Sequence, residues 1–178
     1  RKFYTNVIRK WGDGESIQVG ESLNIVDFNK DSIPDLLFEV GNMEFPKLDF
    51  SNMYCAYDIL LVSKGWLNYE MRIFPTNAHS QMTSSGDFNG DGDLDIVLGG
   101  NFTATRVKFG HFDAIQGIYL MGDGKGNFDY IDASESGLIL KGEVRDIKQI
   151  TSSKGENHLI FSRNNDKPKI FKSTVTKN

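Results

Sequence analysis

Residues 87–98 read Asp-Phe-Asn-Gly-Asp-Gly-Asp-Leu-Asp-Ile-Val-Leu. Oxygen-bearing side chains occupy positions 1, 3, 5, 7 and 9 of this stretch, and an apolar run follows at once. A hard cation such as Ca²⁺ takes about six to eight oxygen ligands, and a short loop supplies them only when such residues alternate along a curled backbone. Gly92 stands at position 6, where the sharp turn favours a residue that tolerates positive φ. The stretch therefore predicts a calcium loop that runs into a strand.

The predicted ligands of this loop lie at its alternate positions. They are the side chains of Asp87, Asn89, Asp91 and Asp95 and the backbone carbonyl of Asp93. Position 12, where an EF-hand carries a bidentate glutamate, is Leu98, and strand-like residues follow it. The loop is therefore predicted to be a strand-flanked site and not an EF-hand. Clusters of Asp, Asn and Gly are also plain turn formers, which is the alternative interpretation.

A second stretch matches the first at an offset of 60 residues. Residues 27–38 read Asp-Phe-Asn-Lys-Asp-Ser-Ile-Pro-Asp-Leu-Leu-Phe, with acidic or amide residues at four of the same places. Ser32 replaces the turn glycine and Lys30 brings a positive charge to the rim, so we expect a weaker calcium site here. Its predicted ligands are the side chains of Asp27, Asn29, Asp31 and Asp35 and the backbone carbonyl of Ile33.

The match between the two stretches continues beyond the loops. An apolar run at 59–62 corresponds to another at 118–121. Such short runs, bounded by Gly, Asn and Asp, fit buried strands better than helices, which need about ten or more periodic residues. Residues 122–127, Gly-Asp-Gly-Lys-Gly-Asn, are typical of a hairpin turn. The sequence therefore predicts an all-β fold with approximate repeats at 24–75 and 84–133.

A repeat of this length, built from short strands, suggests the blades of a β-propeller. A degenerate unit at 143–172 keeps only Asp146 of the acidic loop and is expected to bind no ion. The whole chain, 1–178, is then a single propeller segment of about three blades. Because a closed propeller typically has about four to eight blades, we expect further blades in absent sequence or a partner that covers the open edges. A compact β domain that does not close is the alternative.

Composition excludes several classes of protein. The 178 residues are 39% hydrophobic and 25% charged, with a formal net charge of −4, which argues against disorder and against a nucleic-acid role. No apolar run approaches the roughly 18 residues of a membrane helix. Cys55 is the only cysteine, so no internal disulfide is possible, and the three histidines form no catalytic pattern. The chain begins at Arg1, so we expect a mature product or a fragment of a longer protein.

Two connections, 43–56 and 102–116, are longer than a blade requires. The second mixes aromatic and basic residues, a composition typical of recognition surfaces. These candidate binding residues are Phe102, Arg106, Lys108, Phe109, His111 and Phe112. The alternative is that the phenylalanines pack the connection onto its own blade.

The acidic loop and the Ile-Val-Leu-Gly-Gly-Asn that follows closely resemble the FG-GAP and VCBS repeat family. The resemblance covers roughly residues 20–133, including the Gly-Asp-Gly-Lys-Gly-Asn-Phe hairpin, and residues up to about 172 are similar to the closing part of secreted bacterial members. It implies propeller blades whose loops each hold one calcium ion between adjacent strands. It also implies an exported or surface-exposed adhesion or binding module, a class that includes integrin α-chain heads.

The sequence and this resemblance together predict a non-catalytic, calcium-stabilised propeller segment. We expect it to recognise a protein or a glycan in the extracellular space, at the cell surface or in the periplasm. One alternative is an accessory domain of an extracellular hydrolase or lyase whose catalytic residues lie elsewhere. Another is a structural subunit of a cell-envelope complex, in which neighbouring subunits complete the propeller.

Overall fold

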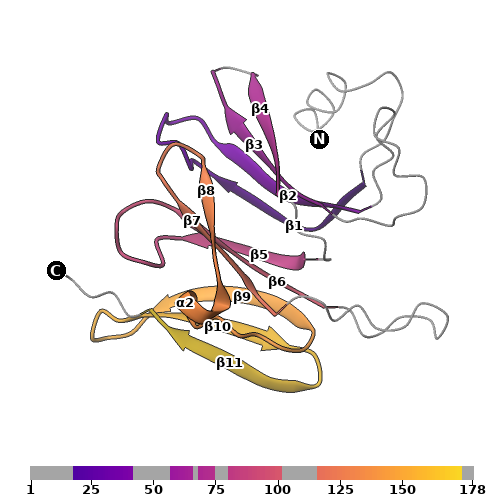
Figure 1. Cartoon of the computed structure of the whole chain (residues 1–178), viewed down its shortest axis with the longest axis vertical. Helices are drawn as coiled ribbons and strands as arrows, with labels where there is room; N and C mark the ends of the chain where they lie inside the picture. Colours follow the sequence, from indigo (N-terminus) through magenta and orange to yellow (C-terminus); the bar gives the residue numbers. More distant parts are fainter. Residues whose placement is uncertain (1–17, 42–56, 66–67, 75–79, 102–115, 174–178) are drawn as a thin grey trace.

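A computed structural model describes residues 18–41, 57–65, 68–74, 80–101 and 116–173 of the chain. In these ranges the strands form three separate antiparallel sheets, accompanied by one short helix. Figure 1 shows the first sheet at the top, the third at the bottom and the second between them. The expectation of an all-β fold is confirmed for the part of the chain that is described.

The first and second sheets have the same strand order. The first runs β1-β2-β3-β4 and the second β5-β6-β7-β8, so in both sheets neighbours in sequence are neighbours in space. Their bounds are β1 (Gln18–Val26), β2 (Asp35–Gly41), β3 (Tyr57–Ser63), β4 (Tyr69–Phe74), β5 (Ser80–Gly86), β6 (Asp95–Gly100), β7 (Ile118–Gly122) and β8 (Phe128–Ile131).

The register of the two sheets also agrees at the acidic loops. Val26 pairs with Asp35 across the first loop, and Gly86 pairs with Asp95 across the second. Each loop therefore links a first strand to the second strand beside it, and the last aspartate of the loop opens the second strand.

The third sheet has three strands, β9 (Val144–Thr151), β10 (Asn157–Arg163) and β11 (Asp166–Lys172), in the order β11-β10-β9. A short helix, α2 (Ala133–Ser136), precedes it. The Asp132 side chain caps this helix by accepting a bond from the Ser134 N–H, and Gly137 ends it in a left-handed conformation at φ 69°. Asp146 lies within β9 and not in a loop.

Two apolar cores join the three sheets, and the first strands β1, β5 and β9 lie in contact in that order. The first core, between the first and second sheets, contains Phe28, Leu37, Leu60, Val62, Ile96, Leu98 and Leu120. The second core, between the second and third sheets, contains Phe88, Val97, Leu138, Leu140, Val144, Ile147 and Phe161. A further cluster of Leu36, Phe38, Ile59 and Leu61 belongs to the first sheet.

Strand β6 lies between both cores and is buried along its whole length. Because successive side chains point to opposite faces of a sheet, Ile96 and Leu98 enter the first core while Val97 enters the second. This placement explains why the sequence after the second loop is continuously apolar instead of alternating. The acidic loop is thereby attached to the most deeply buried strand of the second sheet.

The short apolar runs and turns lie where the sequence predicts them. Runs 59–62 and 118–121 fall in β3 and β7. The 122–127 segment joins β7 to β8, with the Asp123 N–H donating to the Asn127 carbonyl at 3.1 Å. None of the helices in the described part of the chain is long and apolar enough to cross a membrane.

Candidate metal centre

The second acidic loop occupies residues 87–94, between β5 and β6. Its backbone turns sharply at two glycines, Gly90 at φ 81° and Gly92 at φ 92°. These are left-handed values that glycine adopts without the steric cost a Cβ would bring. Gly92 therefore has the role that the sequence predicts for position 6, and Gly90 has a similar role at position 4.

The side chains at positions 1, 3 and 5 of this loop bend back onto its own N–H groups. Asp87 accepts bonds from Gly90 N at 2.6 Å and Gly92 N at 3.1 Å. Asn89 Oδ1 accepts from Asp91 N at 2.9 Å, and Asp91 Oδ1 accepts from Asp93 N at 2.8 Å. The oxygens at positions 1, 3 and 5 thus accept bonds from N–H groups of the same curled loop.

The first loop repeats this pattern without glycine. Asp27 accepts from Asp31 N at 3.1 Å and from Ser32 N at 2.8 Å, and Asp31 Oδ1 accepts from Ile33 N at 2.7 Å. Lys30 and Ser32 adopt left-handed φ values of 59° and 66° at positions 4 and 6. The two loops therefore share one backbone path, although the first one places side chains where they are sterically disfavoured.

The last aspartate of each loop is fully buried and hydrogen-bonded to two parts of its sheet. Asp95 accepts from Phe88 N at 3.0 Å, from Gly122 N at 2.9 Å and from the Tyr119 hydroxyl at 2.8 Å. Asp95 therefore links the start of the loop to the third strand, β7. The sequence spacing predicted Asp95 to be a ligand but did not predict its contacts with Tyr119 and Gly122, which are more than twenty residues away along the chain.

Asp35 has the same position in the first sheet. It accepts from Phe28 N at 2.7 Å and from Ser63 N, at the end of β3, at 2.6 Å. Burial raises the pKa of both the Asp35 and the Asp95 carboxyl, and the backbone hydrogen bonds from Ser63 and Gly122 oppose that rise. Burial and the bond to Asp95 also raise the pKa of Tyr119, which keeps that hydroxyl a neutral donor.

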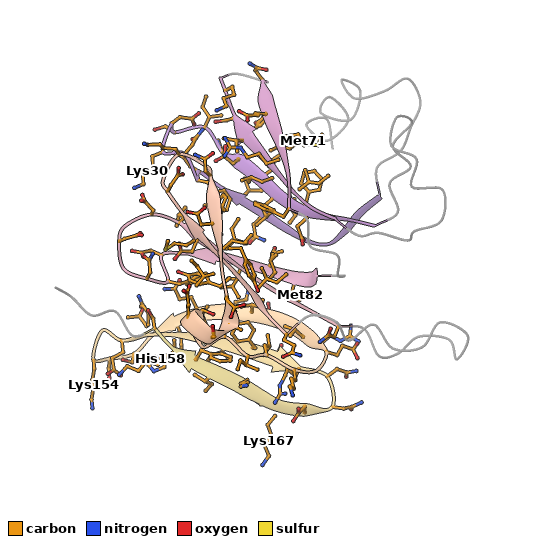
Figure 2. The ribbon with its side chains drawn as sticks, in the orientation of Figure 1. Lys30, Met71, Met82, Lys154, His158 and Lys167 are labelled. Atoms are coloured by element: carbon orange, nitrogen blue, oxygen red, sulfur yellow. The ribbon has the colours of Figure 1, made fainter. Side chains whose placement is uncertain are left out.

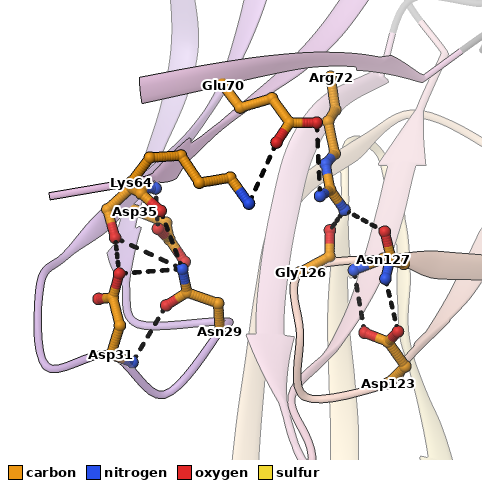
Figure 3. Close-up of polar contacts among 10 residues, drawn as sticks. Asn29, Asp31, Asp35, Lys64, Glu70, Arg72, Asp123, Gly126 and Asn127 are labelled. Atoms are coloured by element: carbon orange, nitrogen blue, oxygen red, sulfur yellow. Dashed lines mark hydrogen bonds and ion pairs between the residues drawn. The ribbon is translucent and has the colours of Figure 1, made fainter. Parts of the chain in front are cut away.

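The end of β3 contacts the first loop through Ser63. Figure 3 shows Asn29, Asp31 and Asp35 of this loop, with Lys64 of the following turn nearby. The Ser63 hydroxyl donates to Asp31, and Asn29 Nδ2 donates to the Ser63 carbonyl at 3.0 Å. The bond from Ser63 lowers the pKa of the Asp31 carboxyl, and the nearby Lys64 ammonium contributes to the same shift. Ser63 was not identified by its sequence, because nothing in the local pattern around residue 63 marks it as a loop partner.

A lysine of the first loop reaches the second loop. The Lys30 ammonium forms an ion pair and hydrogen bond with the Asp93 carboxylate. This bond is the main cause that raises the pKa of Lys30, and the charges of Asp91 and Asp87 act in the same direction. The sequence predicts the positive charge of Lys30 at the rim of the first loop, but the structure places this ammonium group against the second loop.

The donor set of both loops suits a hard cation in chemical type. It consists of carboxylate, amide and carbonyl oxygens, which Ca²⁺ prefers. Among the described residues, no group of three or more His, Cys, Asp or Glu side chains converges in an arrangement that would hold a metal ion. The oxygens at positions 1, 3 and 5 are instead bonded to loop N–H groups, so a cation would share them with those donors. Binding would also require these side chains to converge.

The other predicted site residues lie outside the described ranges. This applies to all six candidate binding residues of the connection 102–116, which include His111. Cys55 and His79 also lie outside the described ranges. The third histidine, His158, lies in β10 with its Nδ1 at 3.2 Å from the Glu156 carbonyl oxygen.

Comparison of the chain with protein-family models, with curated proteins and with solved structures found no match.

Proposed function

We propose that the chain is a non-catalytic segment of a β-propeller, stabilised by Ca²⁺ at its two acidic loops, that serves protein or glycan recognition outside the cytoplasm. The observation that carries this proposal is the structural similarity of the two acidic loops. Two stretches 60 residues apart share residue spacing and left-handed turns at positions 4 and 6. They also share four side-chain to backbone bonds, from the N–H groups of positions 6, 5, 7 and 2 to the side chains of positions 1, 3, 5 and 9. Each occupies the same position in a sheet of the same strand order.

The proposed role of the ion is structural. Asp87, Asp91 and Asp93 place three carboxylates within one short loop, and like charges at this spacing repel each other. A divalent cation that binds the folded loop and not the unfolded chain adds its binding free energy to the stability of the fold. The loop leads directly into β6, the strand whose side chains enter both cores. Stabilisation of the loop would therefore extend to the whole described structure.

The arrangement of the sheets is the support for propeller blades. Three antiparallel sheets follow one another, their first strands lie in contact, and each interface is filled by apolar side chains. Three blades are fewer than the roughly four needed to close a propeller. We therefore propose that further blades or neighbouring subunits complete it.

Thermal unfolding with and without calcium tests this function. We expect the melting temperature of metal-stripped protein to rise by roughly 5–10 °C when Ca²⁺ is present at about 100 times its Kd. The double variant Asp87→Asn, Asp91→Asn should lose most of this rise, while Asp129→Asn, which removes a charge from the exposed part of β8, should keep it. Melting curves of wild-type protein that coincide in excess calcium and in excess chelator contradict the proposal.

Recognition is proposed for the connection 102–116. A glycan array or a panel of extracellular proteins, probed with the calcium-loaded chain, gives the direct test. Binding that is lost in the pair Arg106→Ala, Phe109→Ala supports this assignment. Binding that the pair leaves unchanged contradicts it.

A further inference from the structure

The contact between Lys30 and Asp93 joins the two acidic loops through residues that are 63 apart in sequence. Lys30 is position 4 of the first loop and Asp93 is position 7 of the second. Figure 2 shows the Lys30 side chain at the edge of the molecule where the first and second sheets meet. Its side chain is 56% exposed and that of Asp93 27%, so the pair lies at a wet surface and not in a core.

The backbone at Lys30 makes this residue unusual. Its φ of 59° is left-handed, and the equivalent position in the second loop is Gly90, with φ 81°. A side chain in this region is disfavoured because its Cβ crowds the following carbonyl oxygen. When a non-glycine residue keeps a strained backbone conformation, its side chain is a candidate for a function. Here that function is a positive charge placed on another loop.

The position of Asp93 allows the contact to persist with a metal bound. The ligand predicted at position 7 is the backbone carbonyl, so the Asp93 carboxylate lies outside the predicted ligand set. Lys30 can therefore hold this carboxylate while a cation binds the other oxygens of the loop. A fixed ammonium and a divalent cation at the same loop nevertheless repel each other.

We propose that Lys30 is a built-in counter-charge of the second loop, which supports this loop in the absence of metal and weakens its affinity for a divalent cation. The first loop thereby sets the calcium affinity of the second through a single side chain. This inference rests on the proposed calcium binding.

Calorimetric titration with CaCl₂ tests the effect on affinity. All variants carry Asp31→Asn, which is intended to leave only the second loop to titrate. Lys30→Met keeps the length of the side chain but removes its charge, and it should tighten binding about tenfold at low salt and by less at physiological ionic strength. Lys30→Arg keeps the charge and should stay near the parent. Lys64→Met removes a positive charge beside the first loop and should also match the parent.

Urea unfolding in excess chelator tests the support in the absence of metal. Lys30→Met should unfold at a lower urea concentration than the parent, and the double variant Lys30→Met, Asp93→Asn should be no worse than the single ones, because both changes remove the same pair. Saturating calcium should shrink or reverse the difference between parent and Lys30→Met.

The outcomes separate the two proposals. Equal calcium affinity in parent and Lys30→Met overturns the proposal that Lys30 weakens calcium binding, and it leaves the proposed calcium binding itself intact. If the losses of stability in Lys30→Met and Asp93→Asn add up in the double variant in chelator, the proposal that Lys30 stabilises the metal-free second loop through Asp93 is overturned. No saturable calcium heat in either protein overturns calcium binding at the second loop, together with the effect of Lys30 on affinity. If the chain that keeps Asp31 also gives no saturable heat, the proposed function itself is overturned.

Discussion

At the scale of single residues, Asp35 and Asp95 show how a buried carboxylate fixes a loop to its sheet. Removing a charge from water is costly, and burial accordingly raises the pKa of both groups. Bonds from backbone N–H groups at the loop start and at the third strand offset that cost. The Tyr119 hydroxyl is a further donor to Asp95. These aspartates therefore have a structural role that does not depend on a cation.

Replacing Asp95 with asparagine should destabilise the protein by about 2–4 kcal/mol. The amide has one acceptor oxygen where the carboxylate has two. At least one buried donor therefore loses its acceptor and faces the amide NH₂ group, which is itself a donor. Urea unfolding of metal-stripped protein gives the measurement. Asp129→Asn, an exposed change of the same kind, should stay within about 0.5 kcal/mol of wild type. A loss of less than about 1 kcal/mol in Asp95→Asn would show that the buried bonds are unimportant.

Residue-level features differ in how far they could be predicted. The inward bonds of Asp87, Asn89 and Asp91 follow from alternation along a short loop, which is a local property of the sequence. The partners of Asp95 and the contact of Lys30 with Asp93 depend on which strands and sheets lie together. Such long-range placement leaves no mark in the local pattern, so these features could not be predicted.

At the scale of elements, the β7–β8 hairpin combines a tight turn with a contact between sheets. Asp123 accepts from Lys125 N at 2.8 Å, from Asn127 N at 3.0 Å and from Asn127 Nδ2 at 2.6 Å. Arg72, on β4 of the first sheet, donates to the Gly126 carbonyl and, at 2.6 Å, to Asn127 Oδ1 (Figure 3). The turn is therefore held both by its own aspartate and by the neighbouring sheet.

The hairpin predicts a pH dependence. Desolvation tends to raise the pKa of Asp123, but the bonds from Asn127 and Lys125 prevail and lower it below its ordinary 3.8. The unfolded state then binds more protons near and below that value, so the stability from Asp123 is present above about pH 4 and is lost as the pH falls through the lower folded pKa. The stability advantage of wild type over Asp123→Asn should be full at pH 7 and should shrink towards pH 3. Urea midpoints across this range measure it, and a constant difference contradicts the prediction.

Elements were predicted best where composition and period agree. The runs 59–62 and 118–121 are short, apolar and bounded by turn residues, and both are central strands. The turn 122–127 was predictable because glycine and asparagine mark it. The helix α2 was not predicted, because four residues are too few to show a helical period and its caps alone define it.

At the scale of the whole molecule, the three sheets are held together by two shared cores. The central sheet contributes opposite faces of β6 to both of them. Burial of apolar surface is the main favourable term in folding, so the stability of each sheet depends on its neighbour. The all-β class was predictable from strand-like runs, whereas the packing order of the sheets was not, because it depends on surfaces far apart in sequence.

Truncating Leu98 to alanine should destabilise the whole described structure. This side chain is fully buried in the first core, and such a deletion costs about 2–5 kcal/mol. Hydrogen exchange should show lower protection in both the first and the second sheet. Ile170→Ala, an exposed aliphatic change in β11, is the control and should alter protection little. Loss of protection confined to the second sheet would indicate that the sheets unfold independently.

Direct titration of the metal-stripped protein with Ca²⁺ tests the central claim. The two loops predict saturable binding of two ions per chain, the weaker of which is lost in Asp31→Asn and the stronger in Asp91→Asn. Titration heats that do not saturate, or that neither substitution changes, would contradict calcium as the ion that holds these loops.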